Sequence, residues 1–295
     1  MSTPAPVVIC FGETLWDVLP GGRLPGGAPM NVAIHLCYQG LAPLVVSRLG
    51  DDPPGRELRE YLRSKGVADA GLQTDAGHRT GIVQANVTNK TEVTYDIVED
   101  VAWDHIAPDE ATAARVAVSA VFVYGSLAAR HETSRNTLLG YLQLAKRKVF
   151  DVNLRPPHYT PERTLQLLAA ATLVKMNHHE LAEITGWLGG PGDLRTGMTS
   201  LKDRYGLEAV IVTRAENGAA ALTGEGYFEH PGFSVAVADT IGSGDAFLAT
   251  FLAGYLRAAP VPDVLQRACR VGAYVATQKG ATPPYPAGDI DALLT

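Results

Sequence analysis

The strongest constraint on the fold of this chain is a regular alternation of two kinds of segment. Short apolar runs rich in β-branched residues occupy residues 7–11, 44–47, 118–124, 148–152, 172–176 and 209–213, and stretches with helical spacing lie between them, such as 55–65, 133–145 and 161–170. This alternation predicts an α/β fold whose mainly parallel sheet is covered by helices on both faces. The near-continuous hydrophobicity of the runs indicates strands that are buried on both sides.

Two segments break this pattern. Residues 80–104 alternate apolar and polar side chains around Val93, Tyr95 and Ile97, with "TNKT" as a turn, which predicts a hairpin. The Gly- and Pro-rich stretch "LPGGRLPGGAP" follows the first strand. We expect a single domain over residues 1–295 with a small β lid formed by about 13–30 and 80–104; the alternative is a surface extension without a role.

Polar residues gather at the ends of the predicted strands. In open α/β sheets, ligands bind beyond the carboxyl ends of the strands. The residues at or shortly after such ends are Asp17, Ser126, Asp151, Asn153, Arg155, Asn177 and Thr213. Their convergence on one edge of the sheet predicts a polar site for a small molecule.

The stretch "DTIGSGDAF" (239–247) predicts an anion hole in that site. Apolar residues after it recur at spacings of three and four, which predicts a helix from about residue 244 toward 260. Gly242, Ser243 and Gly244 stand at its start, where unpaired N–H groups and the helix dipole attract phosphate. Asp245 is either a favourable partner of the dipole or a general base. A carboxylate beside a bound phosphoryl group adds repulsion, and stability alone does not require a carboxylate at this position. This favours a role for Asp245 as general base.

Several function classes are excluded by what the sequence lacks. It contains no G-x-x-x-x-G-K-[ST], no G-x-G-x-x-G after the first strand and no G-x-S-x-G. His178, His179 and Glu180 lack the H-E-x-x-H spacing of a zinc site. A net charge of −6 without clusters argues against nucleic-acid binding, and no segment is long and apolar enough to cross a membrane. Three scattered cysteines and no basic leader predict a cytoplasmic location.

Two motifs resemble those of a known family. "DTIGSGDAF" resembles the C-terminal signature of the PfkB carbohydrate kinases, the ribokinase-like sugar kinases, and "PGGAPMNVAIHLCYQG" (25–40) resembles their N-terminal glycine signature. The segments "FGETLWDVLPGG", "SRLGDDPPGREL", "YDIVEDVAWD", "YGSLAAR", "FDVNLRP" and "KMNHHE" are most similar to the bacterial fructokinase branch. The resemblance implies a ribokinase-like three-layer α/β/α fold with a mainly parallel central sheet and a small β lid.

The resemblance implies a sugar site. Its residues are Asp17, Gly26, Gly27, Asn31, Trp103, Asp151, Asn153 and Arg155. Asp17 can accept hydrogen bonds from two neighbouring hydroxyls, and Arg155 can donate to sugar or phosphate. Gly26 and Gly27 permit close approach to the sugar, with a plain turn as the alternative. Trp103 either covers the sugar from the lid or packs in a core.

The resemblance also implies a nucleotide site. Asn177 and Glu180 match the family's N-x-x-E, which positions Mg²⁺ through water and the phosphates of ATP. Thr213 and Gly218 match the nucleotide-binding strand end, but Ala215 replaces its first glycine and argues against close backbone approach there.

Two further family positions carry smaller expectations. Asp239 and Ile241, with the segment 275–286, correspond to a monovalent-cation site for K⁺, although Pro284 stands where a hydroxyl residue is common. Ser243 replaces the commoner alanine of the signature, and we expect its hydroxyl to add a donor to the anion hole.

The implied activity is ATP-dependent phosphorylation of a free sugar, most closely D-fructose to fructose 6-phosphate. Asp245 would act as general base, with the amides of Gly242 to Gly244 and Mg²⁺ stabilising the transferring phosphoryl group. The alternatives are another acceptor (ribose, 2-keto-3-deoxygluconate or a phosphosugar) and a sugar- or nucleotide-binding regulator without catalysis. A homodimer through the lid is expected, because exposed strand edges need covering and relatives often pair through theirs.

Overall fold

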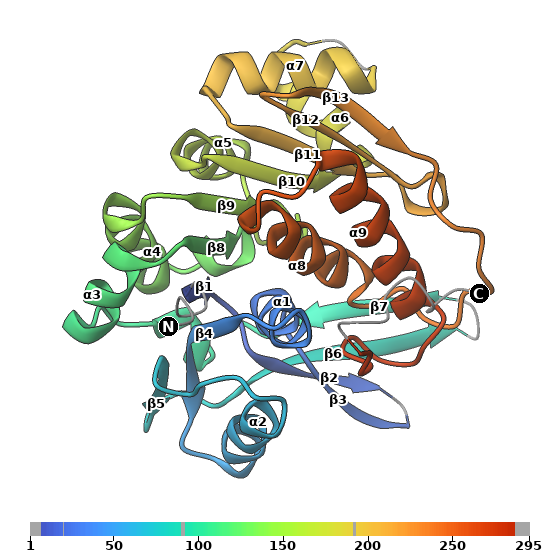
Figure 1. The fold of residues 1–295 in the computed structure, drawn as a ribbon. Helices are drawn as coiled ribbons and strands as arrows, with labels where there is room; N and C mark the ends of the chain where they lie inside the picture. The colour runs from blue at the N-terminus through green and yellow to red at the C-terminus, as the bar shows by residue number, and fades with distance from the viewer. Residues whose placement is uncertain (1–6, 20, 90–91, 191–192, 287–295) are drawn as a thin grey trace, which may run out of the picture.

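A nine-stranded sheet runs through the centre of the molecule in the computed structural model, which describes residues 7–19, 21–89, 92–190 and 193–286 (Figure 1). The strand order is β13-β12-β11-β10-β9-β8-β1-β4-β5. The seven strands from β11 to β5 are parallel, and β12 and β13 add an antiparallel edge. Their bounds are β1 Val7–Phe11, β4 Ala42–Gly50, β5 Leu72–Asp75, β8 Val121–Gly125, β9 Lys148–Asp151, β10 Leu173–Asn177, β11 Ala209–Thr213, β12 Ala219–Thr223 and β13 Gly226–His230.

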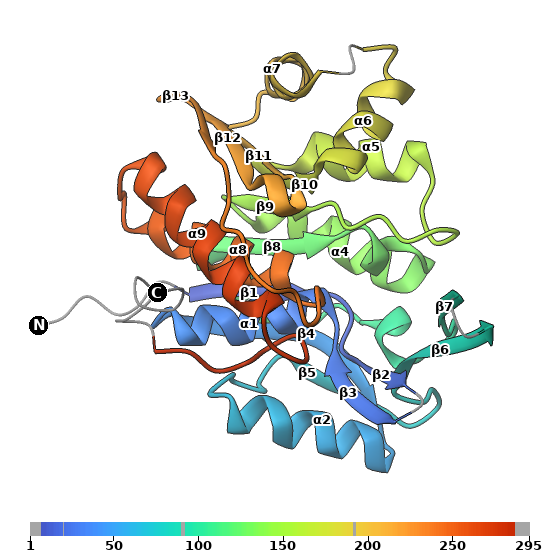
Figure 2. The same cartoon turned by 90° about the vertical axis from the view of Figure 1, so that its right-hand side faces the viewer.

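Helices cover both faces of this sheet (Figure 2). They are α1 Ala28–Tyr38, α2 Pro53–Ser64, α3 Glu110–Val118, α4 Glu132–Leu144, α5 Pro161–Ala170, α6 His178–Trp187, α7 Leu194–Tyr205, α8 Ser243–Leu256 and α9 Val261–Ala276, with the short 3₁₀ turns η1 Ala102–His105, η2 Leu127–Ala129 and η3 Ala215–Asn217. Helices α3 to α7 pack on one face, and α1, α2, α8 and α9 pack on the other. The predicted three-layer α/β/α architecture is confirmed.

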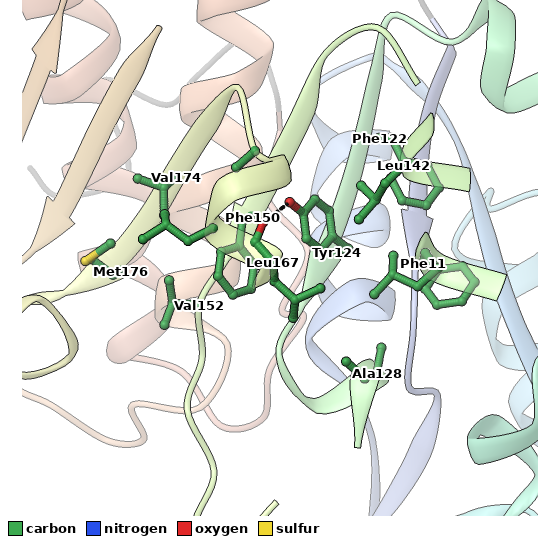
Figure 3. Close-up of a cluster of buried hydrophobic side chains, with 14 of the residues drawn as sticks. Phe11, Phe122, Tyr124, Ala128, Leu142, Phe150, Val152, Leu167, Val174 and Met176 are labelled. Carbon is green, nitrogen blue, oxygen red and sulfur yellow. Dashed lines mark hydrogen bonds between the residues drawn. The ribbon is translucent and has the colours of Figure 1, made fainter. Parts of the chain in front are cut away.

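Alternate side chains of each central strand enter opposite cores, as the pleat of a strand requires. Phe11, Phe122, Tyr124 and Phe150 point toward α4 and α5 (Figure 3), where the Tyr124 hydroxyl donates to the Leu167 carbonyl at 2.8 Å. The intervening strand residues face α1 and α8. Each core therefore fixes the strand ends relative to the helices that begin beside them.

A second, four-stranded sheet lies at the lower right of Figure 2 and is called the small sheet below. Its order is β3-β2-β6-β7, with β2 Leu15–Leu19, β3 Gly22–Gly26, β6 Gly81–Asn89 and β7 Glu92–Ile97. Strand β2 is antiparallel to β3 and parallel to β6, and β6 and β7 are antiparallel. The predicted turn "TNKT" lies partly outside the described residues, at 90–91.

Several predicted boundaries differ from the structure: the run predicted at 44–47 is the longer strand β4, and two other ends are wrong for a local reason. The run 118–124 was expected to be one strand, but Val118 ends α3 and is 78% exposed, and β8 starts at Val121. Ser119 causes the break, since its hydroxyl donates to the Val116 carbonyl. Helix α8 ends at Leu256 rather than near Pro260, because Ala258 has a positive φ of 54°. Within the described ranges, none of the helices has the length and apolar character that crossing a bilayer requires.

Candidate active site

The carboxyl ends of β9, β10 and β11 bring predicted residues together at one edge of the central sheet. Asp151, the last residue of β9, is the register partner of Lys175 on β10. Asn177 at the end of β10 pairs with Thr213 at the end of β11. The polar positions after these strands are therefore neighbours, as parallel strands with a common direction require.

The anion hole expected from the sequence corresponds to the start of α8. Gly242 is the N-cap residue with φ 78°, and a Cβ on it would lie 2.2 Å from the Ala281 carbonyl oxygen, so only glycine fits. The first N–H groups of a helix lack intrahelical acceptors. That of Ser243 makes a 3.3 Å hydrogen bond to the Thr240 carbonyl. The expected extra donor is wrong, because the Ser243 hydroxyl donates to the Gly272 carbonyl at 2.8 Å.

Asp245 follows in the first turn of α8 and is joined to α1. The side-chain amide of Asn31 donates to Asp245 Oδ2 at 2.9 Å. Burial and then the negative charge of Asp151 raise the pKa of Asp245 to about 6, against the opposing effects of Lys175 and Asn31. A carboxylate with this pKa is mostly ionised at neutral pH and accepts a proton more readily than an ordinary aspartate. The geometry thus places a buried carboxylate, held by Asn31, beside a helix start.

Sequence reasoning missed Lys175, a buried cation whose charge interacts with that of Asp245. Its Nζ donates to Asp151 Oδ1 at 2.9 Å, and a Cβ on Gly244 would lie 3.1 Å from the same nitrogen. Burial works against the charged form, but the charges of Asp151, Asp245 and Glu180 outweigh it and raise the pKa of Lys175. The signal was present, since one lysine interrupts the apolar run "TLVKM".

Asp17 and the glycine pair meet on the small sheet. A Cβ on Gly26 would lie 2.2 Å from Asp17 Oδ2, and Gly27, at φ 116°, would place one 2.4 Å from the Glu13 carbonyl oxygen. Gly26 is the last residue of β3 and pairs with Leu15, so it is more than part of a turn. Burial raises the pKa of Asp17 to about 6, and the charge of Arg155 opposes this rise.

Glu13 is a second residue that sequence reasoning missed. Its side chain is buried; Oε1 accepts from the Ala28 N–H at 3.2 Å, and Oε2 has no partner among the described residues. Burial raises the pKa of Glu13 to about 7, with a smaller contribution from Asp245. An acidic residue directly after an apolar strand was the available signal, as it was for Asp17.

The loop after β9 carries the remaining predicted sugar residues. Asn153 adopts a left-handed conformation with φ 44°, and its carbonyl accepts from the Ser126 hydroxyl at 3.1 Å. Arg155 is exposed, and its charge acts on Glu13, Asp17 and Asp245 by opposing the rise of each pKa. Arg155 is thus close enough to this acidic group to balance part of its charge.

Glu180 caps the start of α6. The Asn177 side chain accepts from the N–H of His179 and of Glu180, both at 2.9 Å, while Glu180 accepts from the N–H of Asn177 at 2.8 Å and of Leu154 at 2.9 Å. The reciprocal capping box uses Oε2 of Glu180, and Oε1 accepts from Leu154, so both oxygens of the carboxylate are engaged. Because Mg²⁺ usually keeps several waters, an ion held by Glu180 through water fits this donor set. His178 and His179 belong to no metal-binding group among the described residues.

The turn after β11 keeps a glycine-like backbone despite its alanine. Ala215 has φ 51°, in the left-handed region that glycine favours. Gly218 has φ 77°, and a Cβ on it would lie 2.1 Å from the His230 carbonyl oxygen. The replacement of glycine by Ala215 therefore leaves a tight turn beside Thr213.

Asp239 joins the two segments that were expected to form the monovalent-cation site, 239–241 and 275–286. Its Oδ1 accepts from the Ile241 N–H at 3.0 Å, and its Oδ2 accepts from the Gly280 N–H at 3.2 Å. The loop before α8 is therefore tied to the segment after α9.

Trp103 belongs to a small core rather than to an open sugar pocket in this structure. Its side chain has no exposed surface and packs with Leu15, Val83 and Leu127. The Arg130 guanidinium lies over its ring at 4.0 Å. The structure thus favours the packing alternative for this tryptophan, because a fully enclosed ring offers no surface to a ligand.

Comparison with known proteins identifies relatives over nearly the whole chain. The profile described as pfkB family carbohydrate kinase matches residues 9–288. A fructokinase from Klebsiella pneumoniae is 32% identical over 95% of this chain and 96% of its own length. Among solved structures, a fructokinase from Xylella fastidiosa with bound ATP has a TM-score of 0.86 at 23% identity, covering 97% of each chain. A fructokinase double mutant from Vibrio cholerae O395, with fructose, ADP and potassium bound, has a TM-score of 0.84 at 23% identity over all of both chains.

Proposed function

The chain belongs to the pfkB family of carbohydrate kinases, and from this premise we propose that it transfers the γ-phosphoryl group of ATP to the C6 hydroxyl of D-fructose. The products are fructose 6-phosphate and ADP. The fructose assignment is supported by the fructokinase relatives that cover nearly the whole chain. Family membership also argues against the alternative of a regulator without catalysis.

The observation that carries the mechanism is the contact between Asn31 and Asp245 at the start of α8. Asn31 holds Asp245 Oδ2, which leaves Oδ1 to accept the proton of the sugar hydroxyl. As the C6 oxygen attacks, its bond to the γ-phosphorus forms, the bond from that phosphorus to the β–γ bridging oxygen breaks, and the proton passes to Asp245. ADP leaves with the electron pair of the broken bond.

Charge on the moving phosphoryl group is stabilised by donors that are already in place. The N–H groups of Gly242 and Gly244 lie at the start of α8, at the positive end of its dipole, and the ammonium of Lys175 lies against Gly244. The N–H of Ser243 would join them by exchanging its long bond to Thr240 for the phosphoryl group. Arg155 adds positive charge from the loop after β9. Thr213 and Gly218 line the nucleotide side, with Asn177 and Gly244. Glu180 would hold the Mg²⁺ that binds with ATP, through water, and the ion would neutralise charge on the β- and γ-phosphates.

The sugar lies between the small sheet and the central sheet. Asp17 accepts from two neighbouring hydroxyls, and Gly26 and Gly27 allow the ring to approach the backbone. Asp151 and Asn153 complete the polar wall on the other side. The small sheet acts as the lid that excludes water, which would otherwise compete with the sugar as acceptor.

Three further assignments belong to this proposal. The Asp239–Ile241 segment holds a potassium ion, as supported by the potassium in the Vibrio cholerae fructokinase structure. The chain forms a homodimer through the small sheet. It works in the cytoplasm, where its three cysteines, free in this structure, stay reduced.

An acceptor panel tests the fructose assignment. ADP release is measured with ATP and Mg²⁺ and, in turn, D-fructose, ribose, 2-keto-3-deoxygluconate and fructose 6-phosphate, and phosphorus NMR locates the new ester. We expect the highest kcat/KM with fructose and an ester at C6. A higher kcat/KM with any other acceptor would replace fructose while leaving the kinase assignment intact.

A further inference from the structure

Two histidines and an aspartate meet at the base of the small sheet, outside the residues assigned to sugar or nucleotide. His78 lies between β5 and β6, Asp100 follows β7, and His105 ends η1. The two imidazole rings stack with their centroids 3.7 Å apart. Asp100 Oδ1 lies 2.8 Å from His105 Nε2 and 3.7 Å from His78 Nε2, and one ligand atom from each residue lies within 4.8 Å of the others.

A buried carboxylate orients His78 from behind. Asp75 is 3% exposed, and its Oδ2 lies 3.1 Å from His78 Nδ1 and 2.6 Å from Arg48 Nε. Because the ionised carboxylate only accepts, Nδ1 of His78 carries the proton, and in the neutral ring the lone pair of Nε2 faces Asp100. A carboxylate behind an imidazole is the usual support of a histidine that binds metal. His78 thus presents an acceptor toward another acceptor, an arrangement that a bound cation stabilises.

We propose that His78, Asp100 and His105 bind a divalent transition-metal ion of the zinc, cobalt or nickel type. Zinc–nitrogen bonds of about 2.0–2.1 Å in a tetrahedral site place neighbouring ligand atoms roughly 3.4 Å apart. The distances of 2.8 and 3.7 Å to Asp100 lie on either side of that spacing. Imidazole nitrogen selects such metals over magnesium. The Asp100 side chain is 74% exposed, so water reaches the site and completes the coordination.

The ion joins the segments that lead into and out of the β6–β7 hairpin. These segments already touch, since the Ala102 N–H donates to the Arg79 carbonyl at 2.8 Å. A metal held by His78 on one side and by Asp100 and His105 on the other clamps the same junction. The site therefore fixes the base of the small sheet and performs no chemistry on the substrate.

Isothermal titration with Zn²⁺ and visible absorption with Co²⁺ test the site on tag-free protein stripped with a chelator. We expect one site with micromolar or tighter affinity and a rise in Tm of several degrees on adding Zn²⁺. His78→Ala and His105→Ala should each weaken binding more than 10-fold. Asp75→Asn, which keeps the three proposed ligands but removes the charge that supports His78 and pairs with Arg48, should weaken it about 10-fold.

His179→Ala is the matched control, because His178 and His179 also stack, with ring centroids 3.9 Å apart. We expect it to bind Zn²⁺ as the wild type does. The proposal is overturned if the wild type binds no Zn²⁺ or Co²⁺ at millimolar concentration. It is equally overturned if His78→Ala and His105→Ala bind with unchanged affinity.

Discussion

At the scale of single residues, Asp245 and the acidic residue at the equivalent position of α9 allow a matched test of the general base. Asp245→Asn should lower kcat by about 10²–10⁴-fold with little change in ATP or fructose affinity, because the amide keeps the Asn31 neighbour but cannot take a proton. Asp263 occupies the same first-turn position in α9, so Asp263→Asn controls for the loss of a dipole partner. Turnover and binding are measured for both variants; near-normal turnover of Asp245→Asn removes the proposed role.

The raised pKa of Asp245, about 6, predicts how activity depends on pH. The base works only when deprotonated, so kcat/KM should be lost as pH falls through 6 and should level off above it. Glu13 and Asp17, with pKa values of about 7 and about 6, titrate in the same pH window. The acid limb of the pH–activity profile therefore reports all three coupled carboxyl groups. The residual activity of Asp245→Asn should lack the part of the pH dependence that comes from titration of Asp245. An unchanged acid limb in that variant would assign the whole limb to the other carboxyls.

Lys175 is predicted to donate to ATP in addition to forming its ion pair with Asp151. Lys175→Met should raise the KM for ATP and lower kcat by roughly 10²-fold, the usual cost of losing one donor to the transition state. It also leaves Asp151 buried without its cation, which can cost about 3–5 kcal/mol. The double variant Lys175→Met with Asp151→Asn removes that unpaired charge. If Tm and kinetics both recover in the double variant, Lys175 is only the structural partner of Asp151.

Part of the site was visible residue by residue. Asp17, Asn31, Asp151 and Asp245 were predicted, and their contacts and mutual charge effects are consistent with one shared site. Lys175 and Glu13 were missed because each stands in or beside an apolar run, where burial rather than chemistry was expected. The position of the Ser243 hydroxyl depends on Gly272 of a different helix, which no local pattern could reveal.

At the scale of elements, the β2–β3 pair sets the position of Asp17. Gly26→Ala should push Asp17 Oδ2 away and raise the KM for fructose by about 10-fold or more, with the KM for ATP unchanged. Gly21 lies in the connection between β2 and β3, and a Cβ on it meets nothing within 4 Å, so Gly21→Ala is the control. Steady-state kinetics with each substrate varied in turn give the answer. Equal effects of the two variants on fructose would contradict the assignment.

Elements with strong periodicity were predicted closely. The strands 7–11 and 209–213 and the helix 161–170 have the bounds expected from the sequence. Strand β12 was missed because "AAALT" carries almost no β-branched residue, and α1 because most of its residues are buried and it shows little apolar–polar period. Strand β3 was not predicted, because Gly22, Pro25 and Gly26 are typical of a loop. Only its pairing with β2 in the structure identifies it as a strand.

At the scale of the whole molecule, strand β3 is an edge of the small sheet and predicts a homodimer. Leu24 on this strand is a large apolar side chain with 37% of its surface exposed. Light scattering should give twice the mass of one chain, and Leu24→Glu should shift it to the monomer by placing a charge at the edge. Val118→Glu, at an exposed position on α3, should leave the dimer unchanged. A wild-type monomer at high concentration would reject this interface.

The layered architecture could be predicted because alternation of strand and helix leaves few arrangements that bury both faces of a sheet. The order of strands could not, since it depends on which helices fill each core. The antiparallel edge of β12 and β13 was also missed, although Asn217-Gly218 before β12 and Gly224-Glu225 between the two strands are turn signals, because the runs beside them carry few β-branched residues.

The hydrogen bond from Asn31 to Asp245 joins residues 214 positions apart. During synthesis on the ribosome, α1 emerges early and α8 near the end, so the carbohydrate-facing half of the chain exists for some time with nothing to activate an alcohol. If Asp245 is the base proposed above, phosphoryl transfer should begin only once translation has passed α8, and a fragment cut before residue 243 should be inactive however well its sheet has formed.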